Sequence, residues 1–352
     1  MRRQVPGGGP LPRERPAAAA GAGGAAWSSP QWRDEAVSWL DARLAARGIE
    51  RTGEIEQPHL RPWATVLRAP TTAGVVWLKA AGPGTAFEVG LYALLAKVVP
   101  ERVLTPIATN PERGWMVLPD GGSTLGERVG DAGMPAALTT ALVAYGRLQR
   151  DLSGHVDEIL ARGVADMRPA MMLQRFDEAL DATASRLGGP EDRATHARVA
   201  ALRPTVTTWC ERLEASLVPP SLDHNDLHPW NILGDGAGDV RFYDWGDSVV
   251  AHPFAAMLVP LRFVTRDGGL DDPGVRRARD AYLQVFAGVA PGEDLAGTLE
   301  IACRVAKVAR VLTWERALQA ADSAGDEIAE TWATAPLETL ASLLDGSYLG
   351  GA

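Results

Sequence analysis

The sequence predicts an α+β protein with two lobes, a β-rich N-terminal lobe and a larger, mostly helical C-terminal lobe. Two observations lead to this prediction. Between residues 60 and 118, short apolar runs alternate with clusters of turn-forming residues, which is typical of strands joined by tight turns. From about residue 138 onward, apolar residues recur at three- and four-residue spacing over long segments, which is typical of amphipathic helices.

The composition limits the class of protein. At 352 residues, with 46% hydrophobic residues, the chain is long enough for one two-lobed enzyme. It has no run of about 18 apolar residues, so we expect no membrane span. The formal net charge of −9 disfavours a nucleic-acid partner and favours a cationic small molecule. Cys210 and Cys303 have no C-x-x-C spacing, so we expect buried reduced thiols and a cytoplasmic protein.

The first 30 residues differ from the rest of the chain. Residues 1–30 are largely Gly, Pro and Ala without periodicity. Such a segment buries too little surface to offset the entropy lost on ordering, so we predict a disordered tail. The N-terminal lobe is then expected to cover residues 31–118 and the C-terminal lobe residues 119–352. This boundary is placed where Pro119 and the glycines after it end an apolar run.

The N-terminal lobe is expected to begin with a helix that starts at Pro30 and ends at Gly48. Strands are expected next, because two runs of strand-forming residues flank a segment of turn residues. Two β-hairpins are predicted, the first from residues 63–68 and 75–80 around a turn at 70–74, and the second from residues 104–108 and 115–118.

The second strand of the first hairpin carries a lone lysine, Lys79, near its end. A helix is predicted to follow, and Glu88 lies in its first turn among the apolar positions. An unpaired carboxylate on an apolar helix face is costly, so an ion pair between Lys79 and Glu88 explains both residues. The alternative is that both side chains are exposed, with Glu88 complementing the helix dipole.

The C-terminal lobe is predicted to be mostly helical, because seven segments have the helical spacing of apolar residues. Trp209, Trp314 and Trp332 fall in these segments and are expected to lie in the core. The predicted helices cover residues 138–152, 169–187, 194–217, 252–264, 273–286, 293–320 and 326–344.

Residues 221–248 carry the side chains best suited to chemistry. Asp226, Asn231 and Asp244 fall on two loops that a predicted hairpin within residues 232–243 joins. Phosphoryl transfer needs one group that accepts the proton of the acceptor hydroxyl, and hard oxygen ligands for magnesium. In this spacing Asp226 would accept the proton, while Asn231 and Asp244 would hold magnesium.

The same residues resemble a known family. The order H-x-D-x-x-x-x-N at residues 224–231, followed by D-W-G at residues 244–246, resembles the catalytic and metal-binding elements of protein-kinase-like enzymes. The local form H-N-D-L-H-P-W-N is similar to the aminoglycoside phosphotransferase branch, whose usual form is H-G-D-L-H-P-x-N. Asn225 stands where that branch commonly has Gly, and Trp245 where protein kinases have Phe.

The resemblance implies a two-lobed protein-kinase-like fold. It also implies an enzyme that transfers the γ-phosphoryl group of ATP, with magnesium, to a hydroxyl of a small molecule. Lys79, held by Glu88, would neutralise the nucleotide phosphates, and the strand that ends with Val117 and Leu118 would lead into the hinge that binds adenine. No Gly-rich loop precedes Lys79, so the turn at residues 70–74 would have to cover the phosphates.

The acceptor is not identified by a motif. The family includes kinases of aminoglycosides, macrolides, choline, homoserine, sugars and fructosamines, and an aminoglycoside or another amino-sugar or amino-alcohol fits the acidic chain. Charged residues on helices usually lie on the solvated face. The residues that would line an acidic acceptor pocket are Asp151, Asp157, Glu158, Asp177 and Glu178.

Two other interpretations stay open. A non-haem iron oxygenase would use His224 and Asp226 with His228 or His252, but it leaves the two expected magnesium ligands without a role. A kinase-like protein without catalysis would bind nucleotide only, although the full set of candidates favours activity. We expect His224 instead to brace its loop by bonding backbone near Asp244. The histidines expected at the surface are His59, His155 and His196.

Overall fold

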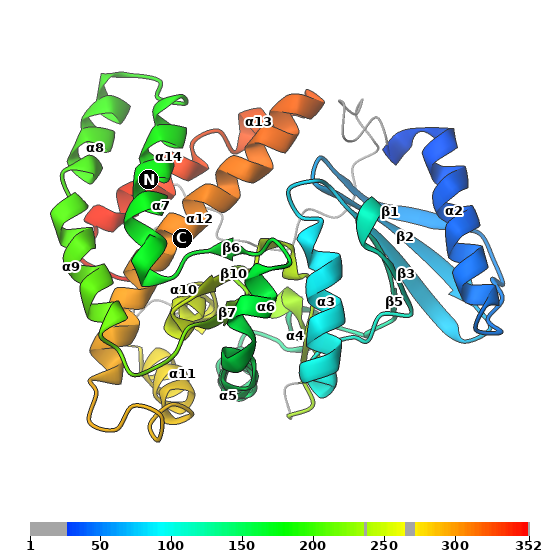
Figure 1. The fold of residues 1–352 in the computed structure, drawn as a ribbon, viewed down its shortest axis with the longest axis horizontal. Helices are drawn as coiled ribbons and strands as arrows, with labels where there is room; N and C mark the ends of the chain where they lie inside the picture. The colour runs from blue at the N-terminus through cyan, green and yellow to red at the C-terminus, as the bar shows by residue number, and fades with distance from the viewer. Residues whose placement is uncertain (1–26, 236–237, 265–271, 351–352) are drawn as a thin grey trace.

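The computed structural model describes residues 27–235, 238–264 and 272–350. Figure 1 shows both predicted lobes, so the α+β class with a β-rich lobe and a larger helical lobe is confirmed. The large sheet is antiparallel, with the strand order β1-β2-β3-β5-β4. Its strands are β1 (Glu56–Arg61), β2 (Ala64–Thr71), β3 (Gly74–Ala81), β4 (Ala108–Asn110) and β5 (Trp115–Pro119).

Two helices cover the two faces of this sheet. Helix α2 (Pro30–Ala45) packs on the outer face, where its Leu40 contacts the same core cluster as Leu78 of β3. Helix α3 (Phe87–Val98) lies on the side of the C-terminal lobe (Figure 1) and shares the main core with Leu118 of β5. Successive side chains of a strand point to opposite faces of the sheet. One face therefore packs in the core under α2, and the other packs in the main core with α3.

Strand β1 was not predicted. It contains Pro58 and a register irregularity between Glu56 and His59, so it lacks the regular alternation of a strand. The omission made one prediction wrong. The turn at residues 70–74 lies at the end of the β2–β3 hairpin far from Lys79, which pairs with Val66. The turn at the same end of the sheet as Lys79 is the one between β1 and β2.

The C-terminal lobe is helical, with α12 running across it (Figure 1). The segment predicted as one helix over residues 194–217 is two helices, because Pro204 has no N–H to continue the hydrogen-bond ladder. The helices are α4 (Leu125–Arg128), α5 (Met134–Leu152), α6 (Val156–Leu160), α7 (Pro169–Ala184), α8 (Pro190–Ala200), α9 (Arg203–Glu214), α10 (Leu258–Val264), α11 (Pro273–Gln284), α12 (Leu295–Ala324), α13 (Ile328–Thr331) and α14 (Ala335–Ala341).

Short strands hold the segment that carries the candidate site. The predicted hairpin is confirmed, since β8 (Ile232–Leu233) pairs with β9 (Arg241–Phe242). A second small sheet has the order β6-β10-β7, with β6 (Ala165–Asp166), β7 (Ser221–Asp223) and β10 (Val249–Ala251). These strands were not predicted, because two or three residues carry no readable period. Strand β7 leads into the candidate site and β10 leads out of it, so their pairing fixes both ends.

The remaining predictions concern the chain ends and the cysteines. Of the predicted tail, residues 1–26 lie outside the described residues, and Trp27 is buried. Cys210 and Cys303 are buried free thiols, as predicted. Within the described ranges, no helix combines the length and apolar character needed to cross a membrane. We propose to keep the lobe boundary after residue 118, since β5 ends at Pro119.

Helix α12 contains a buried lysine that makes stability depend on pH. The Lys307 side chain is fully buried and its Nζ donates to the Ser342 carbonyl at 2.9 Å. Burial lowers the pKa of Lys307 to about 8. The Lys307 amine binds its proton more tightly in the unfolded chain than in the folded one. Burial of the charged amine therefore lowers the unfolding free energy by its full amount at pH values below the folded pKa. This loss of stability disappears as pH rises toward the ordinary lysine value.

Between pH 8 and 10.5 the unfolding free energy of the wild type should therefore rise by at most about 3 kcal/mol. The Lys307→Met variant should not show this rise. Chemical denaturation at several pH values measures the difference in unfolding free energy between the variant and the wild type. Lys97→Met, at an exposed position of α3, is the control and should follow the wild-type curve. Parallel pH curves for the wild type and Lys307→Met would contradict the prediction.

Candidate active site

His224 joins the two loops of the candidate site. Its backbone N–H donates to the Tyr145 hydroxyl of α5 at 2.8 Å, which places the start of the first loop. Its ring Nε2 bonds the Tyr243 carbonyl at 2.9 Å, next to Asp244 on the second loop. Burial lowers the pKa of His224, so the ring is neutral and donates through Nε2. The predicted bracing role is confirmed by this contact.

Asn225 adopts the left-handed backbone conformation, with φ 59°. Glycine reaches this region without steric cost, and Asn is among the side chains that tolerate it best. The Asn225 Nδ2 donates to the Asp247 carbonyl at 3.1 Å and to the Thr313 hydroxyl at 2.9 Å. The structure thus explains how Asn replaces Gly here, and these two bonds stabilise the loop.

Asp226 lies at the centre of a small polar network, with 27% of its side chain exposed. Its carboxylate is 3.2 Å from Arg310 Nη1, 3.3 Å from His228 Nε2 and 3.4 Å from Asn231 Nδ2. Burial acts to raise the pKa of Asp226, but the His228 hydrogen bond and the Arg310 charge outweigh it and hold that pKa below its usual range. Asp226 is therefore ionised at neutral pH.

Asn231 and Asp244 have the chemistry required of magnesium ligands. The Asn231 Nδ2 donates to the Asp226 carbonyl at 2.9 Å, so its side-chain oxygen is the atom left for a cation. The Asp244 carboxylate is 51% exposed, and its residue has φ 64°. Mg²⁺ is commonly held by one or two protein oxygens together with nucleotide phosphates and water, so these two residues fit it.

The glycine of the second loop has a different role from the one predicted. The sharp turn was attributed to the freedom of Gly246, but the residue with positive φ is Asp244. A Cβ at Gly246 would lie 3.4 Å from the Glu88 carboxylate. Gly246 therefore allows close packing of the loop against α3, while the strained backbone is at Asp244, at a candidate functional site.

Lys79 connects the N-terminal lobe to this loop. Its Nζ is 2.7 Å from the Glu88 carboxylate and 2.6 Å from that of Asp244. Glu88 is fully buried, so the predicted ion pair is confirmed and the exposed alternative is wrong. Burial acts to lower the pKa of Lys79, but the charges of Asp244 and Glu88 outweigh it and raise that pKa. Burial raises the pKa of Glu88 to about 7.

Helix α3 holds the second loop through two side chains one turn apart. The Glu88 Oε1 accepts a hydrogen bond from the Trp245 backbone at 3.0 Å. The Tyr92 hydroxyl accepts one from the Asp244 backbone at 3.3 Å. Residues four apart lie on the same helix face, so α3 positions the candidate metal ligand and the lysine partner together.

The two predicted adenine contacts lie in β5, just after Met116, which pairs with Lys79 of β3. Val117 is fully buried and its carbonyl accepts a hydrogen bond from Ile107 at 2.7 Å, so that group is used by the sheet. Leu118 is 7% exposed and lies one residue before the end of the strand. The backbone that leaves the sheet begins at Pro119.

Sequence reasoning missed a polar stripe on α12. Arg310 donates to the Asn225 carbonyl at 2.6 Å in addition to its contact with Asp226. Thr313 accepts from the Asn225 side chain, and Arg316 pairs with Asp247 at 2.6 Å. These polar residues at three-residue spacing, in a helix with a long buried face, were the available signal.

It also missed the β1–β2 turn. The Arg61 Nε is buried without a hydrogen-bond partner among the described residues, while its Nη1 donates to the adjacent Leu60 carbonyl at 3.1 Å. His59 was expected at the surface, but it is half-buried. Burial and then the charge of Arg61 lower the pKa of His59 to about 4, and Lys79 and Asp244 also act on it. His59 of β1 pairs with Val66 of β2, which pairs with Lys79 of β3, so β1 places His59 in register with Lys79.

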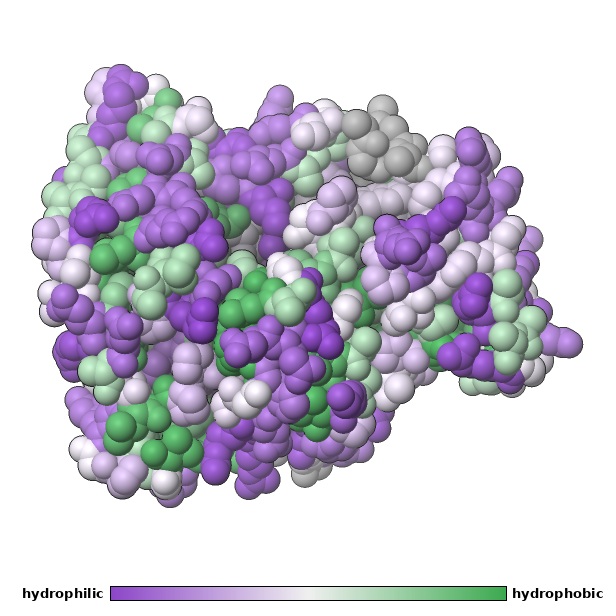
Figure 2. All heavy atoms as spheres, in the orientation of Figure 1, coloured by the Kyte–Doolittle hydropathy of each residue, from purple (hydrophilic) through white to green (hydrophobic). Residues whose placement is uncertain are grey.

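The residues proposed for an acidic pocket do not form one. Asp177 pairs with Arg203 at 2.9 Å and Glu178 with Arg175 at 2.6 Å, both on helix surfaces. Asp151 and Asp157 are exposed, and Glu158 pairs with His155. Figure 2 shows hydrophilic residues spread over this side of the molecule, with the apolar residues in separate patches. These carboxylates belong to a solvated face.

Two of the three tryptophans expected in the core lie outside it. Trp209 packs against the main core, as predicted. Trp314 and Trp332 are half-buried and stack on each other, with ring centroids 5.3 Å apart. The guanidinium carbon of Arg310 lies 6.0 Å from the centroid of the Trp314 ring. The stacked pair thus lies beside the arginine that contacts Asp226.

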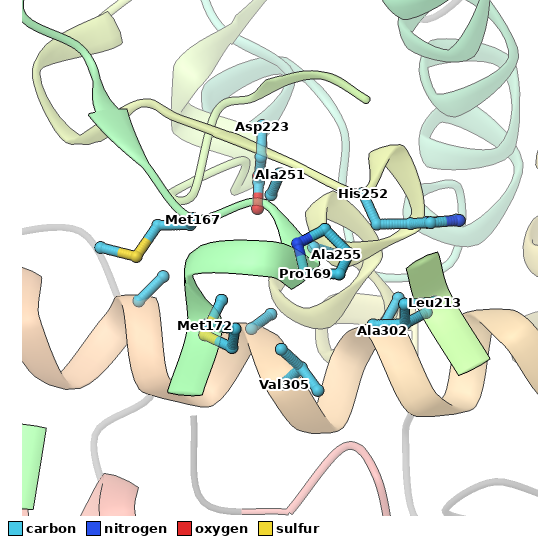
Figure 3. Close-up of a pocket in the computed structure, with 12 residues that line it drawn as sticks. Met167, Pro169, Met172, Leu213, Asp223, Ala251, His252, Ala255, Ala302 and Val305 are labelled. Carbon is cyan, nitrogen blue, oxygen red and sulfur yellow. The ribbon is translucent and has the colours of Figure 1, made fainter. Parts of the chain in front are cut away.

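A cavity lies next to the site but does not extend it. Figure 3 shows the Asp223 carboxyl pointing toward a space between α7 and α12, lined by Met172 and Val305 among others. Its volume is about 10 Å³, which is at the limit for one water molecule. It is too small for an acceptor, and burial raises the pKa of Asp223 to about 7.

The geometry does not support the iron site. His224 uses its Nε2 for the Tyr243 carbonyl, and His252 bonds Ser216 and the Phe254 backbone instead of turning toward Asp226. In the part of the chain that the structure describes, no three His, Cys, Asp or Glu side chains are grouped to hold a metal ion. A two-residue magnesium site shared with phosphates needs no such group.

Comparison with known proteins decides the family. Residues 64–291, more than half of the chain, match the model of the phosphotransferase enzyme family, abbreviated APH. The chain belongs to this family. It is a small-molecule kinase, and the resemblance to aminoglycoside phosphotransferases that the sequence indicated is confirmed. No curated protein matches the sequence significantly.

Solved structures similar to this kinase share its protein-kinase-like fold. A type I macrolide 2'-phosphotransferase is 18% identical, with a TM-score of 0.55 over 88% of this chain and 97% of its own. The macrolide 2'-phosphotransferase of Brachybacterium faecium is 19% identical, with a TM-score of 0.53 over 89% and 98%. The choline kinase of Streptococcus pneumoniae is 13% identical, with a TM-score of 0.54 over 88% and 99%. At these identities the likeness concerns the fold alone.

Proposed function

We propose that this small-molecule kinase binds ATP and magnesium between its lobes and transfers the γ-phosphoryl group to a hydroxyl of a small molecule. The observation that carries the proposal is the Lys79 ammonium group, which bridges the buried Glu88 and the half-exposed Asp244. The buried ion pair of Lys79 and Glu88 needs no second, half-exposed carboxylate for stability. A lysine next to such a carboxylate does fit a site where the lysine neutralises phosphates beside a bound metal ion.

In the proposed reaction, ionised Asp226 accepts a hydrogen bond from the acceptor hydroxyl and directs its oxygen toward the γ-phosphorus. The new oxygen–phosphorus bond forms as the bond to the β,γ-bridging oxygen breaks, the proton passes to Asp226 and ADP leaves. Lys79 neutralises phosphate oxygens, and Asn231 and Asp244 would hold the magnesium. Magnesium, when bound, supplies further charge neutralisation on the phosphates. Adenine would lie at the end of β5, against Leu118 and the backbone after it.

Arg61 supplies a further contact to the phosphates in this proposal. It is the last residue of β1, next to the β1–β2 turn and at the same end of the sheet as Lys79, and its Nε is buried without a partner among the described residues. A phosphate oxygen would satisfy that donor in place of the backbone N–H groups of a Gly-rich loop.

Arg61→Ala is therefore expected to weaken ATP binding about tenfold, the effect of losing one hydrogen bond to a charged group. Calorimetric titration with ATP and magnesium measures the dissociation constant. Arg68→Ala removes an arginine of β2 that pairs with Glu56, and it should leave ATP affinity unchanged. Equal affinity in wild type and Arg61→Ala would remove Arg61 from the nucleotide site.

The experiment that tests the function measures ADP formation with magnesium against aminoglycosides, macrolides, amino-alcohols, hydroxy acids and sugars. Turnover that depends on one class would establish the kinase and identify its acceptor. Binding of ATP without any turnover would favour the alternative of a nucleotide-binding protein without catalysis. Absence of ATP binding would contradict the proposal. We also propose a cytoplasmic location, which the two free buried cysteines support.

A further inference from the structure

Arg310 approaches Asp226 from the C-terminal lobe, whereas Lys79 approaches the second loop from the N-terminal lobe. Arg310 belongs to α12 and contacts the Asp226 carboxylate at 3.2 Å, while Lys79 contacts Asp244 at 2.6 Å. If Lys79 marks the phosphate side of the site, Arg310 lies on the side where the acceptor must bring its hydroxyl to Asp226. The side chain of Arg310 is 13% exposed, so it borders the site.

Arg310 has donors left after its contacts with Asp226 and Asn225. Its contact with Asp226 uses Nη1, which also donates to the Asn225 carbonyl at 2.6 Å, and its Nε is buried without a partner among the described residues. The neighbouring carboxylate Asp247 pairs with Arg316 at 2.6 Å. A guanidinium has five N–H donors, so Arg310 keeps donors that its described contacts do not use.

A second cation lies nearby. Arg262 of α10 is half-buried, and its pKa is lowered by burial first and by the charge of Arg310 second. Arg262 and Arg310 thus lie close enough for their charges to interact, so two helices bring cationic side chains to this side of Asp226. These side chains suit an anionic group better than a cationic amino-sugar, and two of the acidic residues expected to attract such a sugar, Asp177 and Glu178, pair with arginines on the helix surface.

The side chain of Arg310 is also supported in place. Its guanidinium carbon lies 6.0 Å from the Trp314 ring centroid, and Trp314 stacks on Trp332. An arginine held against an aromatic ring loses less freedom when it binds a ligand, and its planar fork matches a carboxylate or phosphate.

We propose that the acceptor carries an oxyanion, a carboxylate or a phosphate, which Arg310 binds while the hydroxyl of the same molecule rests on Asp226. This inference rests on the proposed kinase function. It concerns the class of substrate that binds at the same site. The oxyanion is not changed by the reaction, because the phosphoryl group is transferred to the hydroxyl.

The test uses pairs of acceptors that differ by one anionic group: glucuronate and glucose 6-phosphate against glucose, glycerate against glycerol, and serine against ethanolamine. The kcat and KM of each are measured for the full chain, Arg310→Met, Arg310→Lys and Arg304→Met. Arg304 lies on the same helix but donates to the carbonyls of Asp345 and Gly346, so its variant is the matched control.

The wild type is expected to favour the anionic member by at least about tenfold in kcat/KM, the range of a charged hydrogen bond. Arg310→Met should reduce that ratio to about one, mainly through KM, and Arg310→Lys should restore part of it. Arg304→Met should behave as wild type. The carboxylate and phosphate pairs separate the two sources of the oxyanion.

Three results would overturn the inference. One is a wild-type preference for the neutral or cationic member of each pair. Another is an equal loss for all acceptors in Arg310→Met, since this would mean that Arg310 only positions Asp226. The third is a rise in KM for ATP alone, which would place Arg310 on the nucleotide.

A binding measurement separates this inference from the proposed function. Glucuronate and glucose 6-phosphate are titrated into the protein saturated with magnesium and a non-hydrolysable ATP analogue. Tighter binding to the wild type than to Arg310→Met supports the inference even without turnover, and equal binding overturns it. Failure of the ATP analogue to bind would instead contradict the kinase function.

Discussion

Replacement of Asp226 by alanine is expected to reduce the rate of phosphoryl transfer by roughly 10²–10⁴-fold, the usual contribution of a general base. Asp226 is the carboxylate that we propose as the base, and among the described residues it is the carboxylate that Arg310 contacts. Steady-state ADP formation, with the acceptor that the screen of candidate substrates identifies, measures the loss.

The same variant should keep its fold and its affinity for ATP. Arg310 retains the Asn225 carbonyl as a partner, and His224 still joins the two loops, so the local structure has support without the Asp226 carboxylate. Thermal denaturation and ATP titration check this. Asp157→Ala removes an exposed carboxylate and is the control. Undiminished turnover in Asp226→Ala would exclude Asp226 as the base.

Replacement of Asp244 by asparagine is expected to lower kcat by roughly 10²–10³-fold, as removal of a key electrostatic contact does in other enzymes. Asparagine tolerates the φ of 64° at this position, so the loop can keep its shape while it loses the charge. Lys79 keeps its ion pair with Glu88. The effect therefore isolates the carboxylate.

Magnesium dependence distinguishes a metal ligand from a structural residue. If Asp244 holds magnesium, the concentration of magnesium needed for half-maximal rate should rise in the variant, and part of the rate should return at high magnesium. Asp181→Asn, on the exposed face of α7, is the control. A lower kcat with the same magnesium dependence as wild type would argue that Asp244 only anchors Lys79.

The candidate site residues between 224 and 246 could be predicted from the sequence because they are close together along the chain. Asp226 and Asn231 are five residues apart on one loop, and the hairpin that brings Asp244 next to them is short. Glu88 could be paired with Lys79 because an unpaired charge on an apolar helix face is costly, and the ion pair at 2.7 Å agrees.

Strand β1 shows where local patterns end. Its identity comes from pairing with β2, and that pairing also decides that Arg61, not the turn at residues 70–74, lies on the Lys79 side of the sheet. Strands of two or three residues, such as β7 and β10, likewise exist only through their partners.

By itself, the sequence determined the two lobes and the helical character of the second lobe, and it singled out the five polar residues that we propose for phosphate binding and proton transfer. Only the tertiary structure decided what surrounds Asp226. Arg310 lies 84 positions from Asp226 in the chain, and its contact depends on how α12 packs near the loop. Periodicity reports which face of a helix is buried, but it does not report which other segment that face meets. The arginine beside Asp226 therefore could not be predicted from the acidic composition of the chain.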